Sequence, residues 1–231
     1  MSTKSMYFAH RNPALAERFR PRWRRHAALA MSMPELWGLI ERYAQCDPVD
    51  DPPPALGVTS RYDAIGVSWF RNYEAFLALQ DSDAIRRMRQ DELEIFGRFT
   101  RDIGFRCSET VLKDEGRGLF KVFSFLGRGE GASTDGFADR LTQGLAADLL
   151  DAPGLGDRLA RLAVCLPLGG SGSGRRNDAL LELSFDSLED AAAFFASDGY
   201  AAAAAAHRPT AIEAERCATR ELVLDDRSLY D

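Results

Sequence analysis

A periodic stretch near the N-terminus constrains the fold more than any other part of this sequence. Its apolar face carries residues that step by four, four, three and four positions: Leu15, Phe19, Trp23, His26 and Ala30. On a helix these residues share one side, which must face a core or a cavity. The His26 imidazole is therefore expected inside the protein. Pro21 is tolerated in this helix only in the first turn or at a kink, because a proline in a helix interior costs about 3 kcal/mol.

The elements around this helix predict an α+β fold. In the first half of the chain we expect strands at 6–10, 36–47, 62–70 and 105–112, with helices over the periodic stretch and at 73–80 and 82–96. The acidic, proline-rich segment 50–54 is expected to be a loop, because proline fits neither a helix interior nor an inner strand. The order of elements is βαββαβ.

The same order begins again after a polar, glycine-containing linker at 113–118. In the second half we expect strands at 119–126, 158–168, 179–185 and 218–224, and helices at 135–150 and 190–207. The glycine-rich segment 169–174 is interpreted as a flexible hairpin connection. It does not read as a phosphate-binding loop, because no Lys-Ser/Thr pair follows it.

Short landmarks recur in the two halves and favour an old duplication. Cys46 corresponds to Cys165 at an offset of 119 residues, and Cys107 corresponds to Cys217 at an offset of 110. Drifting offsets of this kind are typical of a repeat that has gained and lost loop residues. We therefore expect two ferredoxin-like domains, at 1–114 and 118–231.

Two segments of the first half resemble the EthD family, which is named for ethyl tert-butyl ether degradation. A strand ending in Arg11-Asn12-Pro13 is followed by the stripe of Phe19, Trp23 and His26, and the segment 62–70 is similar to the family's apolar strand that ends in Trp-Phe. The resemblance spans most of residues 6–112. It implies a ferredoxin-like βαββαβ unit that pairs into a dimeric α/β barrel. With two such units in one chain, the two sheets are expected to form an intrachain barrel.

Candidate catalytic residues lie on the helical stripe and at strand ends. His26 is the candidate acid or base, because the pKa of an unperturbed histidine, about 6.5, lies near neutrality. Arg11 is a candidate clamp for a carboxylate or enolate oxygen. Asp63 is a candidate base, or a partner that orients His26, if it is buried. A surface ion pair or a packing role is the alternative for each of these residues.

Candidate substrate contacts come from the same helix and from two predicted strands. They are Trp23, Tyr43, Gln45, Asp47 and Trp69. The second half has Phe137, Leu141 and Gly144 where the first has Phe19, Trp23 and His26. A cavity that uses His26 is therefore expected in one half only.

Composition narrows the classes of partner. A net charge of −6 and a pI near 5.2 argue against nucleic acid or an anionic membrane. The sequence shows no secretory signal, no apolar run approaching the roughly 20 residues of a bilayer span, and no disulfide framework among its four cysteines. We expect a cytoplasmic protein that binds a small molecule. A homodimer of the tandem chain stays open.

The expected activity is cofactor-independent proton transfer on a small, apolar, oxygenated molecule, as in isomerases, cyclases, lyases or small monooxygenases. His26 would move the proton, and Arg11 or Gln45 would hold negative charge on oxygen. No metal or cofactor is expected, because the three histidines lack ligand spacing. The alternatives are a non-catalytic binding protein and a haem-binding barrel enzyme, the latter suggested by His207 beside a run of alanines. Fold alone does not choose among them.

Overall fold

The computed structural model describes residues 3–59, 62–116, 118–129, 136–168 and 178–226. The chain forms two compact units, each built from more than one segment. The first unit contains Met1–Asp47, Tyr62–Cys107 and Leu222–Asp231, and the second contains Pro48–Arg61 and Ser108–Glu221. The predicted α+β class is confirmed. The linear domain boundary at 114–118 and the intrachain barrel stay predictions.

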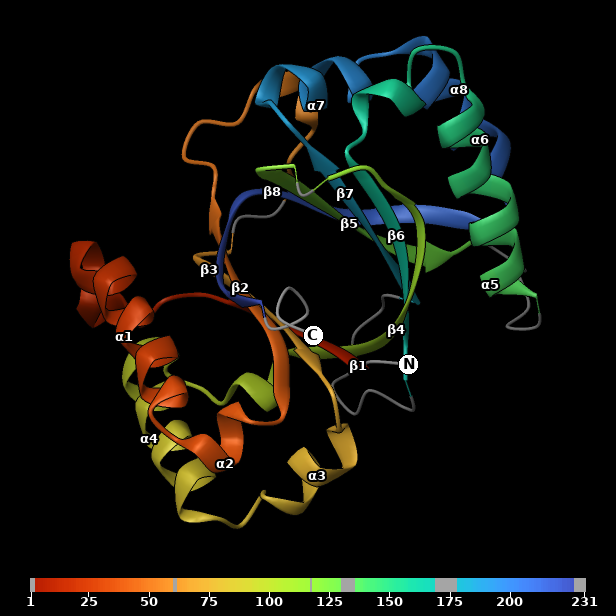
Figure 1. The fold of residues 1–231 in the computed structure, drawn as a ribbon. Helices are drawn as coiled ribbons and strands as arrows, with labels where there is room; N and C mark the ends of the chain where they lie inside the picture. The colour runs from red at the N-terminus through yellow and green to blue at the C-terminus, as the bar shows by residue number, and fades with distance from the viewer. Residues whose placement is uncertain (1–2, 60–61, 117, 130–135, 169–177, 227–231) are drawn as a thin grey trace. The chain divides into compact units, whose positions relative to one another are not determined.

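The first unit is an antiparallel sheet covered on one face by helices. Its strands are β1 (Thr3–Ala9), β2 (Ile40–Pro48), β3 (Ala64–Phe70) and β4 (Gly104–Asp114), in the order β4-β1-β3-β2. The covering helices are α1 (Phe19–Met31), α2 (Pro34–Trp37), α3 (Tyr73–Ala78) and α4 (Asp83–Phe96). Figure 1 shows α1 and α4 side by side. This arrangement places the α1 stripe against the sheet.

The local sequence explains where these helices begin and end. A 3₁₀ turn at Pro13–Arg18 precedes α1, and Pro21 falls in the first turn of α1, as predicted. Ser82 caps α4 by accepting a hydrogen bond from the amide of Ile85, and Gly97 ends the helix at a φ of 68°. The strand expected at 36–47 is partly wrong. Pro34 starts a helical turn, so the strand begins only at Ile40.

The second unit has the corresponding strand order. Its strands are β5 (Phe120–Arg128), β6 (Arg161–Pro167), β7 (Ala179–Phe185) and β8 (Ala211–Asp226), in the order β6-β7-β5-β8. One face of the sheet is covered by α5 (Phe137–Asp139), a π-helix (Arg140–Leu145), α6 (Ala146–Asp151), α7 (Leu188–Phe195) and α8 (Asp198–His207). The helix expected at 190–207 is therefore two helices. The break occurs where Ser197 caps α8.

Three segments of the second unit can be compared with the sequence predictions: the last strand, the proline-rich segment and the glycine-rich segment. The strand expected at 218–224 begins at Ala211, because the alternating charged residues before Cys217 continue the ladder with β5. The segment Pro48–Arg61 packs in this unit, where Leu56 is fully buried in the core and the amide of Val49 donates to the carbonyl of Ala218 at 3.1 Å. The glycine-rich segment 169–174 lies outside the described residues.

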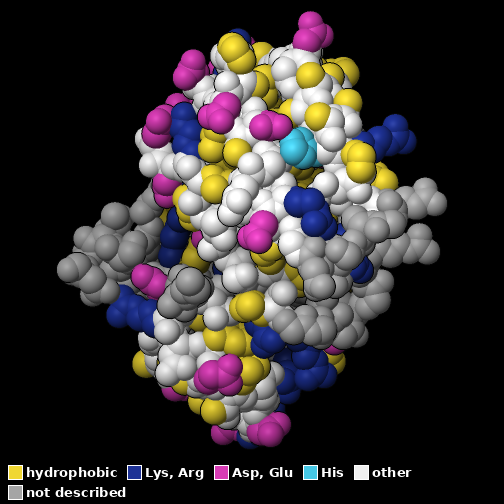
Figure 2. Space-filling view, turned by 90° about the vertical axis from the view of Figure 1, so that its right-hand side faces the viewer, with side chains coloured by type: hydrophobic (Ala, Val, Ile, Leu, Met, Phe, Trp, Pro, Cys, Tyr) yellow, Lys and Arg dark blue, Asp and Glu magenta, His cyan; other side chains and the backbone are white. Residues whose placement is uncertain are grey.

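Four further features are the surface, the cysteines, the length of the helices and the grouping of potential metal ligands. Figure 2 shows apolar side chains scattered among acidic and basic ones on the face that α6 and α8 form. Cys46, Cys107, Cys165 and Cys217 are free and buried. Among the helices that the structure describes, none is long and apolar enough to cross a bilayer. Within the same described residues, no cluster of three or more potential ligands is arranged to hold a metal ion.

Candidate active site

The candidate site is centred on a buried histidine that is paired with a carboxylate. His26 is only 4% exposed, and its Nδ1 lies 2.6 Å from Oδ2 of Asp91 on α4. Arg22, one turn before His26 on α1, also binds Asp91 through both of its terminal nitrogens. The packing of α1 on α4 thus gives Asp91 two cationic or proton-bearing neighbours. The prediction that His26 points inward is confirmed.

The negative charge of Asp91 determines which nitrogen of His26 carries the proton. Burial by itself would raise the pKa of Asp91, but the hydrogen bonds from His26 and Arg22 lower the pKa to about 2. An ionised carboxylate can only accept hydrogen bonds, so Nδ1 of His26 carries the proton in this pair. Nε2 is left as the nitrogen that does not contact Asp91, an arrangement similar to that of a histidine oriented by an aspartate.

A chain of hydrogen bonds leads from the helix to the sheet. The indole Nε1 of Trp23 donates to the hydroxyl of Tyr7 on β1 at 2.8 Å. The Tyr7 hydroxyl lies 3.1 Å from the Tyr43 hydroxyl on β2. The side-chain amide of Gln45 donates to the Tyr43 hydroxyl at 3.4 Å and to the Trp23 carbonyl at 3.1 Å. Trp23, Tyr43 and Gln45, expected as site residues from the sequence, are therefore brought together.

One of the two tyrosine hydroxyl hydrogens takes no part in these hydrogen bonds among the described residues. Each hydroxyl accepts a hydrogen bond from a neighbour, Trp23 or Gln45, and only one of the two hydrogens is needed for the bond between them. The other hydrogen is available to a ligand. Burial, followed by the influence of the other tyrosine, raises the pKa of Tyr7 well above its usual value, and burial also raises the pKa of Tyr43. Both hydroxyls thus stay protonated at neutral pH.

Glu92 is a site residue that the sequence reading missed. It is a buried carboxylate on α4, and it accepts hydrogen bonds from the amide and the hydroxyl of Thr100 at 3.0 and 2.7 Å. Burial raises the pKa of Glu92, while the Thr100 bonds oppose this rise. The available signal was its spacing, because Glu92 occupies the same helical face as the apolar residues Ile85 and Met88.

These side chains line a cavity between the helices and the sheet. An inner chamber of about 140 Å³ is walled by apolar side chains, with polar groups from Tyr7, His26, Tyr43, Ser68 and Glu92. An outer chamber of about 230 Å³ shares Tyr7 and Glu92 with it. The outer chamber is also lined by Arg89, Arg101 and Arg106. The inner chamber therefore combines an apolar wall with groups that can exchange protons or donate hydrogen bonds.

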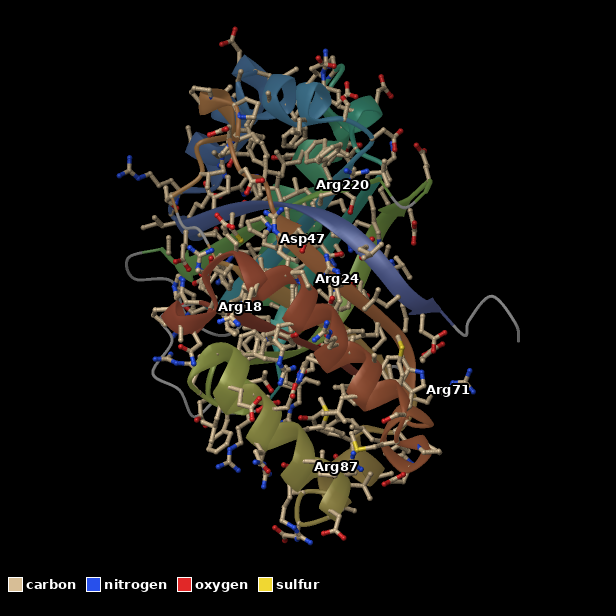
Figure 3. The ribbon with its side chains drawn as sticks, turned by 90° about the vertical axis from the view of Figure 1, so that its left-hand side faces the viewer. Arg18, Arg24, Asp47, Arg71, Arg87 and Arg220 are labelled. Atoms are coloured by element: carbon tan, nitrogen blue, oxygen red, sulfur yellow. The ribbon has the colours of Figure 1, made fainter. Side chains whose placement is uncertain are left out.

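Gln45 and Asp47 bind helix α1 and do not form part of the cavity wall. Arg24 on α1 binds both of them, and Figure 3 shows Arg24 and Asp47 pointing towards one another. The predicted common face of Tyr43, Gln45 and Asp47 on the strand agrees with these contacts. Neither Gln45 nor Asp47 lines either chamber. Their contacts support a positioning role for α1.

Three other predicted residues lie away from the cavity. Asp63 accepts a hydrogen bond from the backbone amide of Arg11 at 3.0 Å and lies 3.7 Å from the Arg11 side chain, which is 49% exposed. Asp63 is not the partner of His26, because it sits before β3 whereas α4 carries Asp91 to the imidazole. Trp69 alternates along β3 with Ser68, a lining residue, so its ring faces the other side of the sheet.

Comparison with known proteins finds a family model that matches the part of the chain that carries the site. Residues 11–98 match the model of the EthD domain. This segment is similar to an EthD domain. It spans α1 and α4, which carry His26, Asp91 and Glu92. The EthD resemblance predicted from the sequence is confirmed for this segment. Among proteins with curated descriptions, none matches the chain.

Solved structures with a similar fold extend over almost the whole chain. An anthrone oxidase-like protein has a TM-score of 0.65 at 13% identity and covers 98% of this chain and 94% of its own. A Fusobacterium nucleatum protein provisionally named a monooxygenase has a TM-score of 0.60 at 10% identity, with coverages of 97% and 93%. A haem-binding protein from Thermus thermophilus has a TM-score of 0.53 at 11% identity, with coverages of 99% and 93%. At such identities the similarity shows a shared fold and says nothing of the activity.

The haem alternative depends on His207, and the surroundings of His207 do not fit that role. Its Nε2, the nitrogen that would ligate iron, lies 2.6 Å from Oδ2 of Asp148. Its ring packs so closely on the π-helix that a Cβ at Gly144 would lie 2.9 Å from it. His207 is not among the residues that line the described cavity of the second unit. We therefore derive no chemistry through haem.

Proposed function

We propose that the first unit catalyses cofactor-independent proton transfer on a small, apolar, oxygenated molecule held in its cavity. The observation that carries this proposal is the His26–Asp91 pair at the wall of the mostly apolar inner chamber. Asp91 holds the imidazole in one tautomer, so the other nitrogen serves as the base.

The tyrosine pair would stabilise the charge that proton removal creates. His26 Nε2 takes a proton from a carbon next to a carbonyl group, and the electron pair of the broken C–H bond moves onto the carbonyl oxygen. The unused hydroxyl hydrogen of Tyr7 or Tyr43 then donates to this oxygen. A preorganised donor of this kind is typically worth about 10²–10³ in rate.

Glu92 would complete the reaction as the second proton-transfer group. Its raised pKa makes it a better proton donor near neutrality than an exposed carboxyl group. Delivery of a proton to a different carbon would give an isomerase, whereas attack of the enolate carbon on a second carbonyl group of the substrate would close a ring, as in a cyclase. Return of the proton to the same carbon would give exchange alone. In a monooxygenase the same carbanion would instead react with molecular oxygen.

The walls of the two chambers support a substrate that is mostly apolar. Aromatic and aliphatic side chains such as Phe70, Phe76 and Met88 line the inner chamber. Arg89, Arg101 and Arg106 in the outer chamber favour a polar or anionic substituent there. The name of the anthrone oxidase-like neighbour supplies a probe of this class, because anthrone is an apolar ketone with an acidic CH₂ group.

The proposal is tested by carbon–deuterium exchange. A panel of cyclic ketones, with anthrone first, is incubated without oxygen in D₂O buffer, and loss of the CH₂ proton signal is followed by NMR. We expect the wild-type protein to accelerate exchange above the buffer rate. Binding of these compounds without any acceleration would instead support the non-catalytic alternative, a carrier of small apolar molecules.

We also infer that the two units are tandem ferredoxin-like repeats whose sheets pair within one chain. Each landmark pair falls on corresponding strands: Cys46 and Cys165 lie on β2 and β6, and Cys107 and Cys217 lie on β4 and β8. The two sheets also share one strand order. Light scattering tests the inference, because sheets that pair only between chains require an obligate dimer. A stable, folded monomer would therefore support pairing within one chain.

A further inference from the structure

The second unit contains its own cavity, between its helices and its sheet. The cavity has a volume of about 270 Å³. Its wall is mainly apolar and includes Leu145, Leu149, Leu181, Leu183, Phe195 and Ala204. An engineered apolar cavity of about 150 Å³ in another protein stays free of water and binds benzene. The cavity of the second unit therefore has room for a molecule of one or two rings.

One buried polar group faces this cavity without a partner. Ser124 on β5 is 3% exposed, and its hydroxyl has no hydrogen-bond partner among the described residues. The side chains of Val122 and Leu126, two positions before and after it, pack in the core beneath the helices, so Ser124 faces the same side. Buried hydroxyls are nearly always hydrogen-bonded. A ligand in the cavity would supply the missing bond.

Of the other polar residues that line the cavity, Tyr200 and Glu213 are already paired, and Arg208 is exposed to solvent. The Tyr200 hydroxyl accepts a hydrogen bond from Arg216 at 2.5 Å and donates to Glu213 at 3.4 Å. Arg216 also forms an ion pair with Glu213. Since Tyr200 and Glu213 line the cavity but compensate within this cluster, they do not call for a charged ligand.

We propose that the second unit holds a separate binding site for a neutral, mostly apolar molecule of one or two rings that carries one hydroxyl or carbonyl group, with the Ser124 hydroxyl as its hydrogen-bond partner. The site differs in kind from the cavity of the first unit. No histidine lines it among the described residues, and its unpartnered polar group is a hydroxyl. The proposal does not depend on the activity proposed for His26.

Binding of 2-naphthol and naphthalene to the full chain tests this site. Both probes have two rings, and only 2-naphthol has a hydroxyl group. Calorimetry gives affinity, and leucine-methyl NMR reports whether the cavity leucines respond. We expect both probes to bind. The change Ser124→Val removes the hydroxyl. It should weaken the binding of 2-naphthol about three- to tenfold, as expected for the loss of one net hydrogen bond, and leave the affinity for naphthalene unchanged.

A matched control comes from the neighbouring strand. Ser184 on β7 is also buried and also lacks a partner among the described residues, but it alternates with the core residues Leu183 and Phe185 and does not line the cavity. Ser184→Val should therefore leave both affinities unchanged. Equal effects of the two serine changes on 2-naphthol would overturn the role of Ser124.

A second variant keeps the test independent of the serine. Ala204 lies on α8 at the cavity wall and is partly exposed, so Ala204→Trp can fill the cavity without a core clash. We expect this change to abolish binding of both probes at the cavity leucines. Undiminished binding and unchanged leucine shifts in Ala204→Trp would overturn the site, as would failure of the wild-type protein to bind either probe.

Discussion

Nδ1 of His26 and Oδ2 of Asp91 lie 2.6 Å apart across the contact between α1 and α4. This contact has a structural part and, in the proposed function, a chemical part. It joins α1 to α4, and it fixes the orientation of an imidazole that lines the cavity. The following predictions separate the structural part of this contact from the chemical part.

The first prediction concerns the tautomer of His26. Because the Asp91 carboxylate is ionised and accepts from Nδ1, neutral His26 should carry its proton on Nδ1. Long-range ¹H–¹⁵N NMR of the histidine rings distinguishes the two nitrogens. In Asp91→Asn the acceptor is no longer charged, so the preference should weaken. A neutral His26 protonated on Nε2 in the wild type would contradict the assigned role of Asp91.

The second prediction concerns stability in acid. Folded Asp91 has a pKa of about 2, below the value of about 3.9 in an unfolded chain. Between these values the unfolded state binds the extra proton, so the free energy of unfolding rises with pH there. The Asp91 contribution, about 2 kcal/mol, is complete above about pH 4 and is lost as the pH falls towards 2. Urea denaturation at several pH values should show this slope in the wild type and a reduced slope in Asp91→Asn. An identical slope in both proteins would refute the assignment.

The third prediction separates the two tyrosines. Tyr7→Phe leaves the buried Trp23 Nε1 without its acceptor, so it should lower the free energy of unfolding by about 1–3 kcal/mol. Tyr43→Phe should lower it less, because the Gln45 amide still donates to the Trp23 carbonyl. Both changes should slow carbon–deuterium exchange, by up to about 10²-fold. Equal stability losses with unchanged exchange would remove the tyrosines from the proposed chemistry.

The fourth prediction concerns the segment 48–61 in the second unit. Arg216 donates to the Leu56 carbonyl at 2.6 Å, pairs with Glu213 and lies over the Phe195 ring at 3.9 Å. Arg216→Met leaves the buried Leu56 carbonyl without its donor and should lower the free energy of unfolding by about 1–3 kcal/mol. Hydrogen exchange at the amides of Val49 and Thr59 should accelerate. Arg220, which is exposed on the same strand, is the control, and Arg220→Met should change the stability by less than about 0.5 kcal/mol.

The sequence predicts the helical stripe and most strands because periodicity records burial directly. Phe19, Trp23 and His26 recur at helical spacing, and all three are buried. The start of β8 was missed for the converse reason. Its first residues alternate alanine or isoleucine with charged side chains, so burial is weak there and the pairing with β5 alone makes a strand.

The partners of His26 could not be predicted from sequence. Asp91 and Glu94 are both carboxylates on the same helix, and only the packing of α1 on α4 turns Asp91 towards the imidazole. Glu92 was not singled out, although its spacing from Ile85 and Met88 places it on the buried face of α4. Arg11 and Asp63 were grouped with His26 as candidate catalytic residues at strand ends. In the structure they pair with each other.

Carbon–deuterium exchange in His26→Gln measures the central claim most directly. Glutamine keeps a polar side chain of similar reach but cannot take up a proton, and His207→Gln in the second unit is the matched control. We predict that exchange of the anthrone CH₂ above the buffer rate falls about 10²–10⁴-fold in His26→Gln and is unchanged in His207→Gln. Wild-type exchange rates in a folded His26→Gln protein would contradict the account.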